Sequence, residues 1–325
     1  MDHDLLAAQV LRALRAHRSQ VQLARRLGYR SNVPASWEAG RSAPPATTFF
    51  AACDRLRLAY RPALAAFFAD DAPFLDELPA ADAVAALVVR LRGTRSTVEL
   101  AARTGLSRHA LGRWQRGQAE PRLPELLLLV DRGTGRLPDF VACFVDPAVV
   151  PILAEEWRRL LAGRALLVRS PWVQPVLLAL ELADYQATPR HDDAWLASRL
   201  DLPVEQVTDA LAALADTEQI TWTGTHWALF QVRTIDTRRD AAGVLQMRAW
   251  FAGQALDRLR ADQPDALFSQ NLFTLSEADL ARLRALHVRH FREVQALVAQ
   301  SEPGERIVLL QRSVIPWDRR PERGP

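Results

Sequence analysis

Arginine is the side chain in this sequence best suited to bind a phosphate or a DNA base, and it supplies all of the permanent positive charge: the chain has 41 Arg and no Lys. A planar guanidinium donates two parallel hydrogen bonds to a phosphate or a guanine edge. Residues 1–60 hold nine Arg against four acids, net +5, and residues 88–137 hold ten against four, net +6. Residues 61–87 carry −4, and so does everything after residue 137. Two positive blocks joined to an acidic body predict polyanion-binding modules, although GC-rich coding would also explain the missing lysine.

The two blocks are copies of one segment. Ser19–Gly28 (SQVQLARRLG) aligns with Ser96–Gly105 (STVELAARTG) at an offset of 77 residues. The offset continues without a gap through Leu14/Leu91, Arg15/Arg92, Arg18/Arg95, Trp37/Trp114, Gly40/Gly117, Pro44/Pro121, Asp54/Asp131 and Phe67/Phe144. So many matches at one spacing indicate an internal duplication.

Each copy contains the signals of a small helical bundle. An amphipathic helix is followed by a short helix that begins at a capping serine, Ser19 or Ser96, because a serine oxygen satisfies the free amides of a first turn. Gly28 or Gly105 ends that short helix. A third helix is expected to start near Ser31 or Ser107 and to end at Gly40 or Gly117, with further apolar helices behind it.

Ser19–Pro44 resembles the Cro/repressor-like helix-turn-helix family of the XRE type, whose pattern is Ser-Gln-x-x-Leu-Ala-x-x-Leu-Gly, a short helix, then Trp-Glu-x-Gly-x-x-x-Pro. The second copy departs mildly, at Thr97, Thr104 and Gln115. In such modules the third helix enters the DNA major groove and the N-terminus of the second holds a phosphate. The resemblance therefore implies two tandem helix-turn-helix (HTH) modules.

Residue by residue, the resemblance makes Gln20 and Thr97 candidates for phosphate clamps. It makes Ser31, Asn32 and Ser36 base-facing candidates in the first copy, with Arg108, His109 and Arg113 as their equivalents in the second. The DNA-binding set that we predict is completed by Arg41, Ser107 and Arg116. Trp37 and Trp114 are interpreted instead as core anchors.

After residue 150 the pattern changes. Two helices, Asp193–Leu200 and Val204–Asp216, precede a hairpin of 220–222 and 227–230, which predicts a winged helix. Only Arg199 is basic between Asp192 and Phe230, so we expect a scaffold or interaction surface there; direct DNA contact is the alternative. Helices are expected at 241–259 and from the Ser276 capping box to about residue 299, with strands at 267–275 and 306–316.

The stretch from about 150 to 317 resembles a large, mostly uncharacterised bacterial family that joins an HTH-like region to a C-terminal domain of unknown function. The matching motifs are Trp195–Leu200, the helix around Met247, Phe273–Leu280 and Arg306–Trp317. The predicted fold is mainly α: two tandem five-helix HTH bundles (1–74 and 75–149), a winged helix (150–236), a small α+β domain for dimerisation or sensing (237–317), and a disordered tail (318–325).

The sequence contains no glycine-rich phosphate loop, zinc-ligand spacing or nucleophile motif, so we predict no enzyme, cofactor or metal. Cys53 and Cys143 are interpreted as buried apolar residues. Without a signal peptide or membrane span the protein is expected in the cytoplasm, on the nucleoid when bound to DNA. The predicted function is a sequence-specific transcriptional regulator that binds double-stranded DNA, with a homodimer and a small-molecule or protein effector as further partners. The alternative is a protein-interaction adaptor, which has no need of two arginine-rich blocks.

Overall fold

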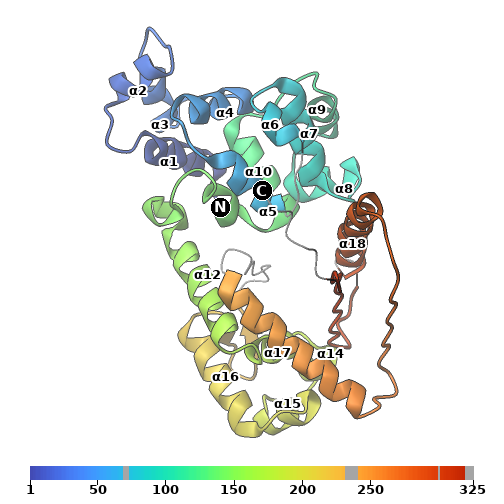
Figure 1. Ribbon diagram of the computed structural model, residues 1–325. Coiled ribbons are helices and arrows are strands. Elements are labelled where there is room, and N and C mark those ends of the chain that lie inside the picture. Colours follow the sequence, from blue (N-terminus) through green and yellow to red (C-terminus); the bar gives the residue numbers. More distant parts are fainter. Residues whose placement is uncertain (69–72, 231–240, 299–300, 319–325) are drawn as a thin grey trace. The chain divides into compact units, whose positions relative to one another are not determined.

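The computed structural model of the chain describes residues 1–68, 73–230, 241–298 and 301–318 (Figure 1). The described residues up to Arg164 form one compact unit, and those from Ala165 onward form a second. The prediction of a mainly α fold is confirmed, because the one sheet in these ranges is a two-stranded hairpin. None of the described helices is long and apolar enough to cross a lipid bilayer. The predicted C-terminal tail, apart from Asp318, lies outside the described residues.

Two sets of five helices follow one another in the first unit. The first set is α1 (His3–Arg15), α2 (Gln20–Arg26), α3 (Val33–Glu38), α4 (Ala46–Arg55) and α5 (Tyr60–Phe68). A short helix, α6 (Phe74–Glu77), precedes the second set: α7 (Ala81–Arg92), α8 (Thr97–Thr104), α9 (Arg108–Gln115), α10 (Leu123–Thr134) and α11 (Leu137–Val141). Equivalent helices of the two sets recur at the offset of the sequence repeat.

The short helices α2 and α8 begin at equivalent serines. The Oγ of Ser19 accepts from the Gln22 N–H at 3.1 Å, while the Ser19 N–H donates to the Gln22 side chain at 2.8 Å. Ser96 and Glu99 make the same reciprocal pair. The hydrogen bond from the Ser96 backbone holds the pKa of Glu99 below its usual value. At the far end of α8, Gly105 takes a left-handed conformation (φ +71°), where a side chain would be strained.

The two copies share one hydrophobic core. Its buried side chains run from Leu6 in α1 to Leu153 in α12 (Pro151–Arg169), without a break between the copies. Helix α10 packs against both α1 and α7. Phe144 of the second copy lies 5.0 Å from Phe49 and 5.6 Å from Tyr60 of the first, measured between ring centroids. Aromatic side chains of both copies therefore pack together inside the shared core.

A short β-bridge also joins the copies. Pro45 and Arg122, equivalent positions of the repeat, pair in antiparallel fashion. Two backbone hydrogen bonds of 2.9 Å flank them: the Ala46 N–H donates to the Pro121 carbonyl, and the Leu123 N–H donates to the Pro44 carbonyl. Exchanging the two copies converts one bond into the other, because the two donors are 77 residues apart in the sequence and so are the two acceptors. Beside the bridge, Glu120 accepts from the amide and hydroxyl of Thr47 at 2.8 and 3.0 Å.

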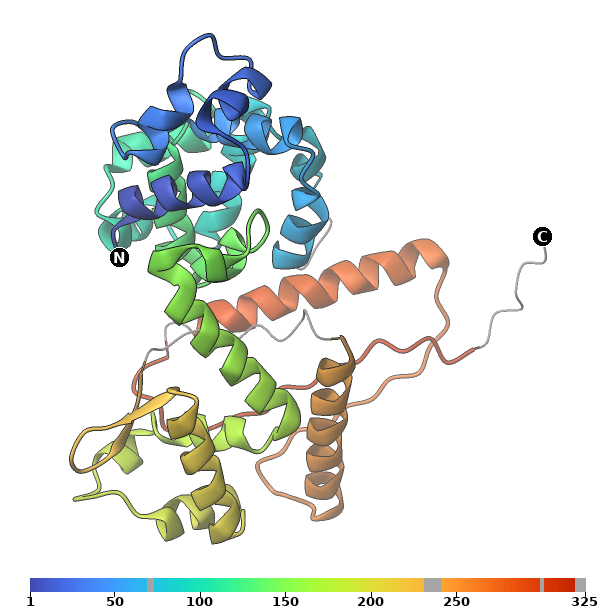
Figure 2. The same ribbon diagram turned by 90° about the vertical axis from the view of Figure 1, so that its left-hand side faces the viewer.

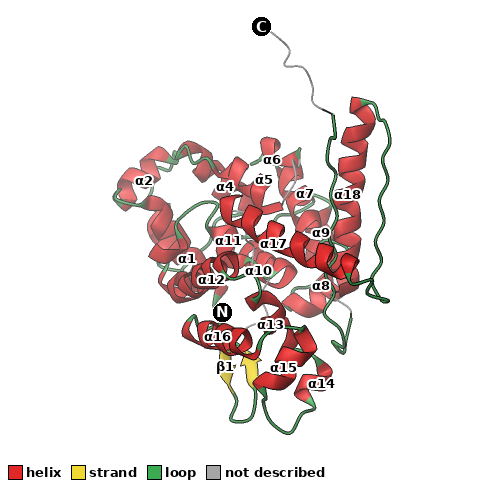
Figure 3. Cartoon of the chain, turned by 60° about the horizontal axis from the view of Figure 1, so that its bottom comes forward, coloured by secondary structure: helices red, strands yellow, loops and turns green. Residues whose placement is uncertain are grey.

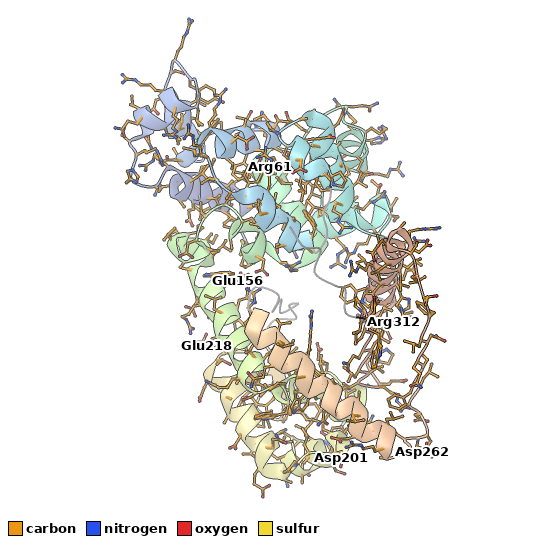
Figure 4. The ribbon with its side chains drawn as sticks, viewed as in Figure 1. Arg61, Glu156, Asp201, Glu218, Asp262 and Arg312 are labelled. Carbon is orange, nitrogen blue, oxygen red and sulfur yellow. The ribbon has the colours of Figure 1, made fainter. Side chains whose placement is uncertain are left out.

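Arginines fasten the remaining segments of the first unit. Arg61, labelled in Figure 4, forms a two-pronged ion pair with Asp54 (2.6 and 3.0 Å) and donates to the Leu75 carbonyl. The short 3-10 helix Pro147–Val149 precedes α12. Within α12, the Nη2 of Arg164 donates to both carboxylate oxygens of the buried Asp139, at 2.8 and 2.7 Å. Removing one partner of such a buried pair is strongly destabilising, because it leaves the other charge without compensation.

The second unit contains the hairpin. Its first helices are α13 (Val173–Ala179) and α14 (Ala183–Gln186), followed by α15 (Asp193–Leu200) and α16 (Val204–Asp216) at the predicted positions. Asp201, labelled in Figure 4, takes a left-handed conformation in the turn between α15 and α16. The strands β1 (Ile220–Trp222) and β2 (Trp227–Leu229) pair antiparallel, again where the sequence predicted them (Figure 3).

The C-terminal part of this unit departs from the prediction. Two long helices, α17 (Ala241–Arg260) and α18 (Glu277–Val298), form as expected, visible in Figure 2 as the brown and the salmon helix. The predicted strands at 267–275 and 306–316 are wrong: both segments are extended but belong to no ladder in the described ranges. The α+β character predicted for this region is therefore absent from the described residues. A β-strand forms only when a neighbouring strand hydrogen-bonds to it, and an alternation of apolar residues does not show whether such a neighbour exists.

Candidate nucleic-acid interface

In the first copy, the predicted base-facing residues lie on or just before α3. Ser31 and Asn32 are exposed in the turn before the helix, while Ser36 is half-buried within it and shares a 2.9 Å hydrogen bond with Ser42. Asn32 and Ser36 are four residues apart and so lie on one helix face. Trp37 is buried on the opposite side and contacts Tyr29 edge to face. The tryptophan is therefore a core anchor, as predicted.

In the second copy, the equivalent residues lie along α9. Ser107 caps the helix, and its Oγ accepts from the His109 N–H at 3.3 Å. Exposed side chains follow at positions spaced four and three residues apart, which places them on one face: His109, Arg113 and Arg116. Arg108 is also exposed, at the first position of the helix. The opposite face is fixed by two buried side chains, Leu111 and Trp114.

Two of the charged candidates extend from the turns that follow these helices. Arg41 is exposed directly after Gly40, and its N–H donates to the Ser36 carbonyl at 3.0 Å. Arg116 is exposed directly before Gly117 and its guanidinium lies over Gly112. A Cβ atom at position 112 would come within 3.3 Å of the Arg116 Nη1. The Arg116 Nε also donates to the Gln118 side chain at 3.3 Å. The structure thus brings Arg116 together with α9 and leaves Arg41 in the loop after α3.

The candidate phosphate clamps are engaged within the protein. The Gln20 amide donates to Glu38 Oε2 at 3.0 Å, and the Thr97 hydroxyl donates to Gln115 Oε1 at 3.1 Å. The two pairs are equivalent in the repeat. Each links the first residue of α2 or α8 to the last residue of α3 or α9. These hydrogen bonds give the two side chains a role in positioning α3 and α9. The free backbone amides at the starts of α2 and α8 can still bind a phosphate oxygen.

Sequence reasoning missed the ion pair behind this link. The guanidinium of Arg15 in α1 donates to the buried carboxylate of Glu38 from Nε at 2.7 Å and from Nη2 at 3.2 Å. In the second copy Gln115 replaces the acid. Among the described residues, the buried Nε of Arg92 and Nε2 of Gln115 then have no hydrogen-bond partner. The sequence contains one indication of this ion pair: arginine occupies the equivalent positions 15 and 92 in two amphipathic helices. An arginine on the buried side of such a helix needs an acceptor.

Further exposed arginines surround the two short helices. Arg25 and Arg26 lie at the end of α2, where Arg26 donates to the Arg55 carbonyl at 3.1 Å. Arg103 is exposed on α8. Arg95 is half-buried and donates to the Gly133 carbonyl at 2.9 Å; burial, together with the nearby Arg103, lowers its pKa. These side chains extend the positive surface of each copy beyond α3 and α9.

A cavity of about 630 Å³ in the first unit lies between α1, the loop after α3 and the start of α10. Its charged lining is mixed, with Arg41 and Arg122 opposite Asp2, Asp4 and Glu125. Three carboxylates repel a phosphate, so this cavity is a poor site for a nucleic-acid backbone. The described residues also contain no cluster of three or more metal-ligating side chains.

Beside the hairpin of the second unit lies a cluster of aromatic side chains with His191 and Asp193. Tyr185 donates or accepts a 3.0 Å hydrogen bond with His191, whose other ring nitrogen lies 2.6 Å from Asp193. Trp222 is about half exposed and contacts Trp227 edge to face. Burial raises the pKa of Tyr185, so this phenol stays neutral. Nothing in the cluster supplies the positive charge that a phosphate backbone would need.

Comparison with known proteins concerns the C-terminal half. A family described as a domain of unknown function (DUF4423) matches residues 154–316, which is just over half of the chain. No curated protein and no solved structure matches the chain. The match agrees with the C-terminal uncharacterised domain that the sequence predicted between about 150 and 317. The chain therefore belongs to the DUF4423 family.

Proposed function

We propose that the chain is a sequence-specific DNA-binding regulator of transcription that reads DNA with α3 and α9 of two tandem HTH modules. The observation that carries the proposal is the exposed cationic face of α9. His109, Arg113 and Arg116 share that face, while Leu111 and Trp114 hold the other side of the helix in the core. A short helix with this arrangement can present guanidinium groups to guanine edges in the major groove.

The duplication supports the same function. The first copy repeats the fold of the second at every helix, including the buried tryptophan and the turn that follows the reading helix. The positive charge of the chain is concentrated in these two copies, and nonspecific affinity for DNA comes from exactly such phosphate contacts. The resemblance to Cro/repressor-like modules points the same way. No enzymatic step is part of the proposal.

The second unit supports self-association rather than DNA contact. From residue 241 onward, Val244 is the one buried large apolar side chain among the described residues. Many others are exposed, among them Leu245, Leu267, Leu272, Phe273, Phe291, Leu297, Val308, Ile315 and Trp317. Most of the stability of a helix in a protein comes from tertiary packing of its apolar face. Exposed apolar area on this scale marks an interaction surface.

We infer that the partner at this surface is a second copy of the chain. A second copy presents the same exposed apolar side chains, so a two-fold symmetric contact would cover both surfaces at once. The unpaired extended segments at 267–275 and 306–316 also offer free backbone groups for pairing between chains.

The test is DNA binding by the full chain as a function of salt. With six to ten phosphates contacted, affinity for a duplex should fall by roughly three to five orders of magnitude between about 50 and 200 mM salt. Fluorescence anisotropy with a labelled duplex measures this. Absence of binding at low salt, or affinity that does not change with salt, would refute the proposal and favour a protein-interaction adaptor.

A further inference from the structure

We propose that one chain reads an imperfect inverted repeat in DNA, with the centres of the two half-sites one helical turn apart. The inference rests on the proposed function and adds the geometry of its target. Its basis is the symmetry of the contact between the two copies, which neither the duplication in the sequence nor the family match specifies.

Equivalent positions of the two copies face each other. Pro45 pairs with Arg122, its own counterpart, and the hydrogen bonds on either side of the pair are interchanged when the copies are exchanged. Helix α4 contacts its counterpart α10, and α5 contacts its counterpart α11. A contact in which each surface meets its own equivalent is isologous and requires a two-fold axis. Copies related by translation along the chain would present two different surfaces to each other.

Contacts further from the bridge follow the same rule. Helix α1 packs on α10, and its counterpart α7 contacts α4. In Figure 1, α2 and α3 lie on one side of α4 and α10, whereas α8 and α9 lie on the other. The two copies are therefore related by an approximate two-fold axis that passes close to the Pro45–Arg122 bridge.

The axis fixes the orientation of the target. A two-fold rotation reverses the direction of α3 relative to α9 along any DNA that lies across the axis. Two readers related in this way match half-sites that are themselves related by a two-fold axis, which is an inverted repeat. A direct repeat would need readers that point the same way, and the isologous contact excludes that arrangement.

The chain also limits the spacing. Glu38 ends α3 seven residues before Pro45, and Gln115 ends α9 seven residues before Arg122. Seven residues reach at most about 25 Å. Turn bonds shorten that path equally in both copies, since the N–H of Arg41 and of Gln118 donate to the carbonyls of Ser36 and Arg113. Two such paths, with half the length of each reading helix added, keep the centres of α3 and α9 less than roughly 65 Å apart. One turn of DNA, about 34 Å, fits this limit, whereas two turns, about 68 Å, do not.

The two half-sites should differ in sequence. The first copy presents Ser31, Asn32 and Ser36, whereas the second presents Arg108, His109 and Arg113 at the same positions. Arginine pairs best with guanine, and asparagine pairs best with adenine. The inverted repeat is therefore imperfect, with guanine concentrated in the half that α9 reads.

Selection of duplexes from a random library by the full chain tests the inference. The expected product is an inverted repeat with half-site centres about 10 base pairs apart. In a titration above the dissociation constant, each chain should bind one site, so that two self-associated chains bind two duplexes. A direct repeat, a spacing of two turns, a single half-site or two chains per site would each overturn the inference while leaving the proposed function intact. No enrichment of any sequence would remove the proposed function itself.

A variant that equalises the two readers tests the assignment of the halves. R108S/H109N/R113S gives the second copy the side chains of the first at all three positions, each of which is exposed. The selected site should become symmetric, and affinity for the original site should fall by roughly tenfold or more. The control R103S/R132S also removes two exposed arginines, from α8 and α10, and should keep the unequal halves. If the triple variant, shown by circular dichroism to be folded, still selects the original unequal site, the inference is wrong.

Discussion

Arg15 holds the buried carboxylate of Glu38 with two hydrogen bonds, and the equivalent Arg92 has a glutamine, Gln115, in place of that carboxylate. The pair ties α1 to the end of α3 in the first copy. In the second copy, buried nitrogens of both Arg92 and Gln115 have no acceptor among the residues that the structure describes. The end of α3 is therefore held more strongly than the end of α9, and the difference comes from one side chain.

Exchanging the two side chains should change stability in opposite directions. E38Q removes charge-assisted hydrogen bonds and should lower the free energy of unfolding by about 1–3 kcal/mol. Q115E offers Arg92 a carboxylate acceptor and should raise it. Urea denaturation followed by circular dichroism measures both. A stabilised E38Q together with a destabilised Q115E would show that desolvation of the carboxylate outweighs its pairing.

The arginines of α9 should determine sequence preference. R108A and R113A should each cost about 1–3 kcal/mol of binding on the preferred site, and less on unrelated DNA, if each pairs with a guanine. R132A, exposed on α10 instead of α9, is the matched control. Binding assays on both duplexes separate the effects: equal losses on every sequence would reassign the two arginines to phosphate contacts.

Self-association should depend on the extended segments of the second unit. Leu272 and Val308 are 83% and 79% exposed in the single chain, so L272D and V308D should leave its fold unchanged and shift a dimer towards monomer. N271D and Q311D add the same charge at exposed polar neighbours and should leave the dimer intact. Analytical ultracentrifugation of the full chain distinguishes these outcomes. A wild-type chain that stays monomeric at all concentrations would rule out the second copy as the partner.

The two thiols should be inert in the folded protein. Cys53 and Cys143 are both buried, and burial, with Asp54 adding to it, raises the pKa of the Cys53 thiol. The reactive thiolate is therefore scarcer at pH 8 than in the unfolded chain, in which a cysteine has a pKa of about 8.5. A colorimetric thiol reagent should react with both cysteines in denaturant and only slowly without it. Two fast-reacting thiols in the native protein would contradict this.

The features that sequence predicted well depend on neighbours within a few residues. The capping serines Ser19 and Ser96 and the hairpin at 220–229 follow from local spacing. The strands expected at 267–275 and 306–316 failed because pairing is a nonlocal property that alternation alone does not provide. Likewise, the engagement of Gln20 by Glu38 joins residues 18 positions apart, and a motif carries no information about such a partner.

The shared core of the two copies has a consequence for how the protein unfolds. Because Phe144 packs among side chains of the first copy and Phe67 packs on Phe140 of the second, neither copy has a complete interior of its own. The pair should melt in a single cooperative transition. Any substitution that weakens the interior then destabilises both α3 and α9 together. The separate contributions of the two copies can therefore be resolved through their surface residues alone.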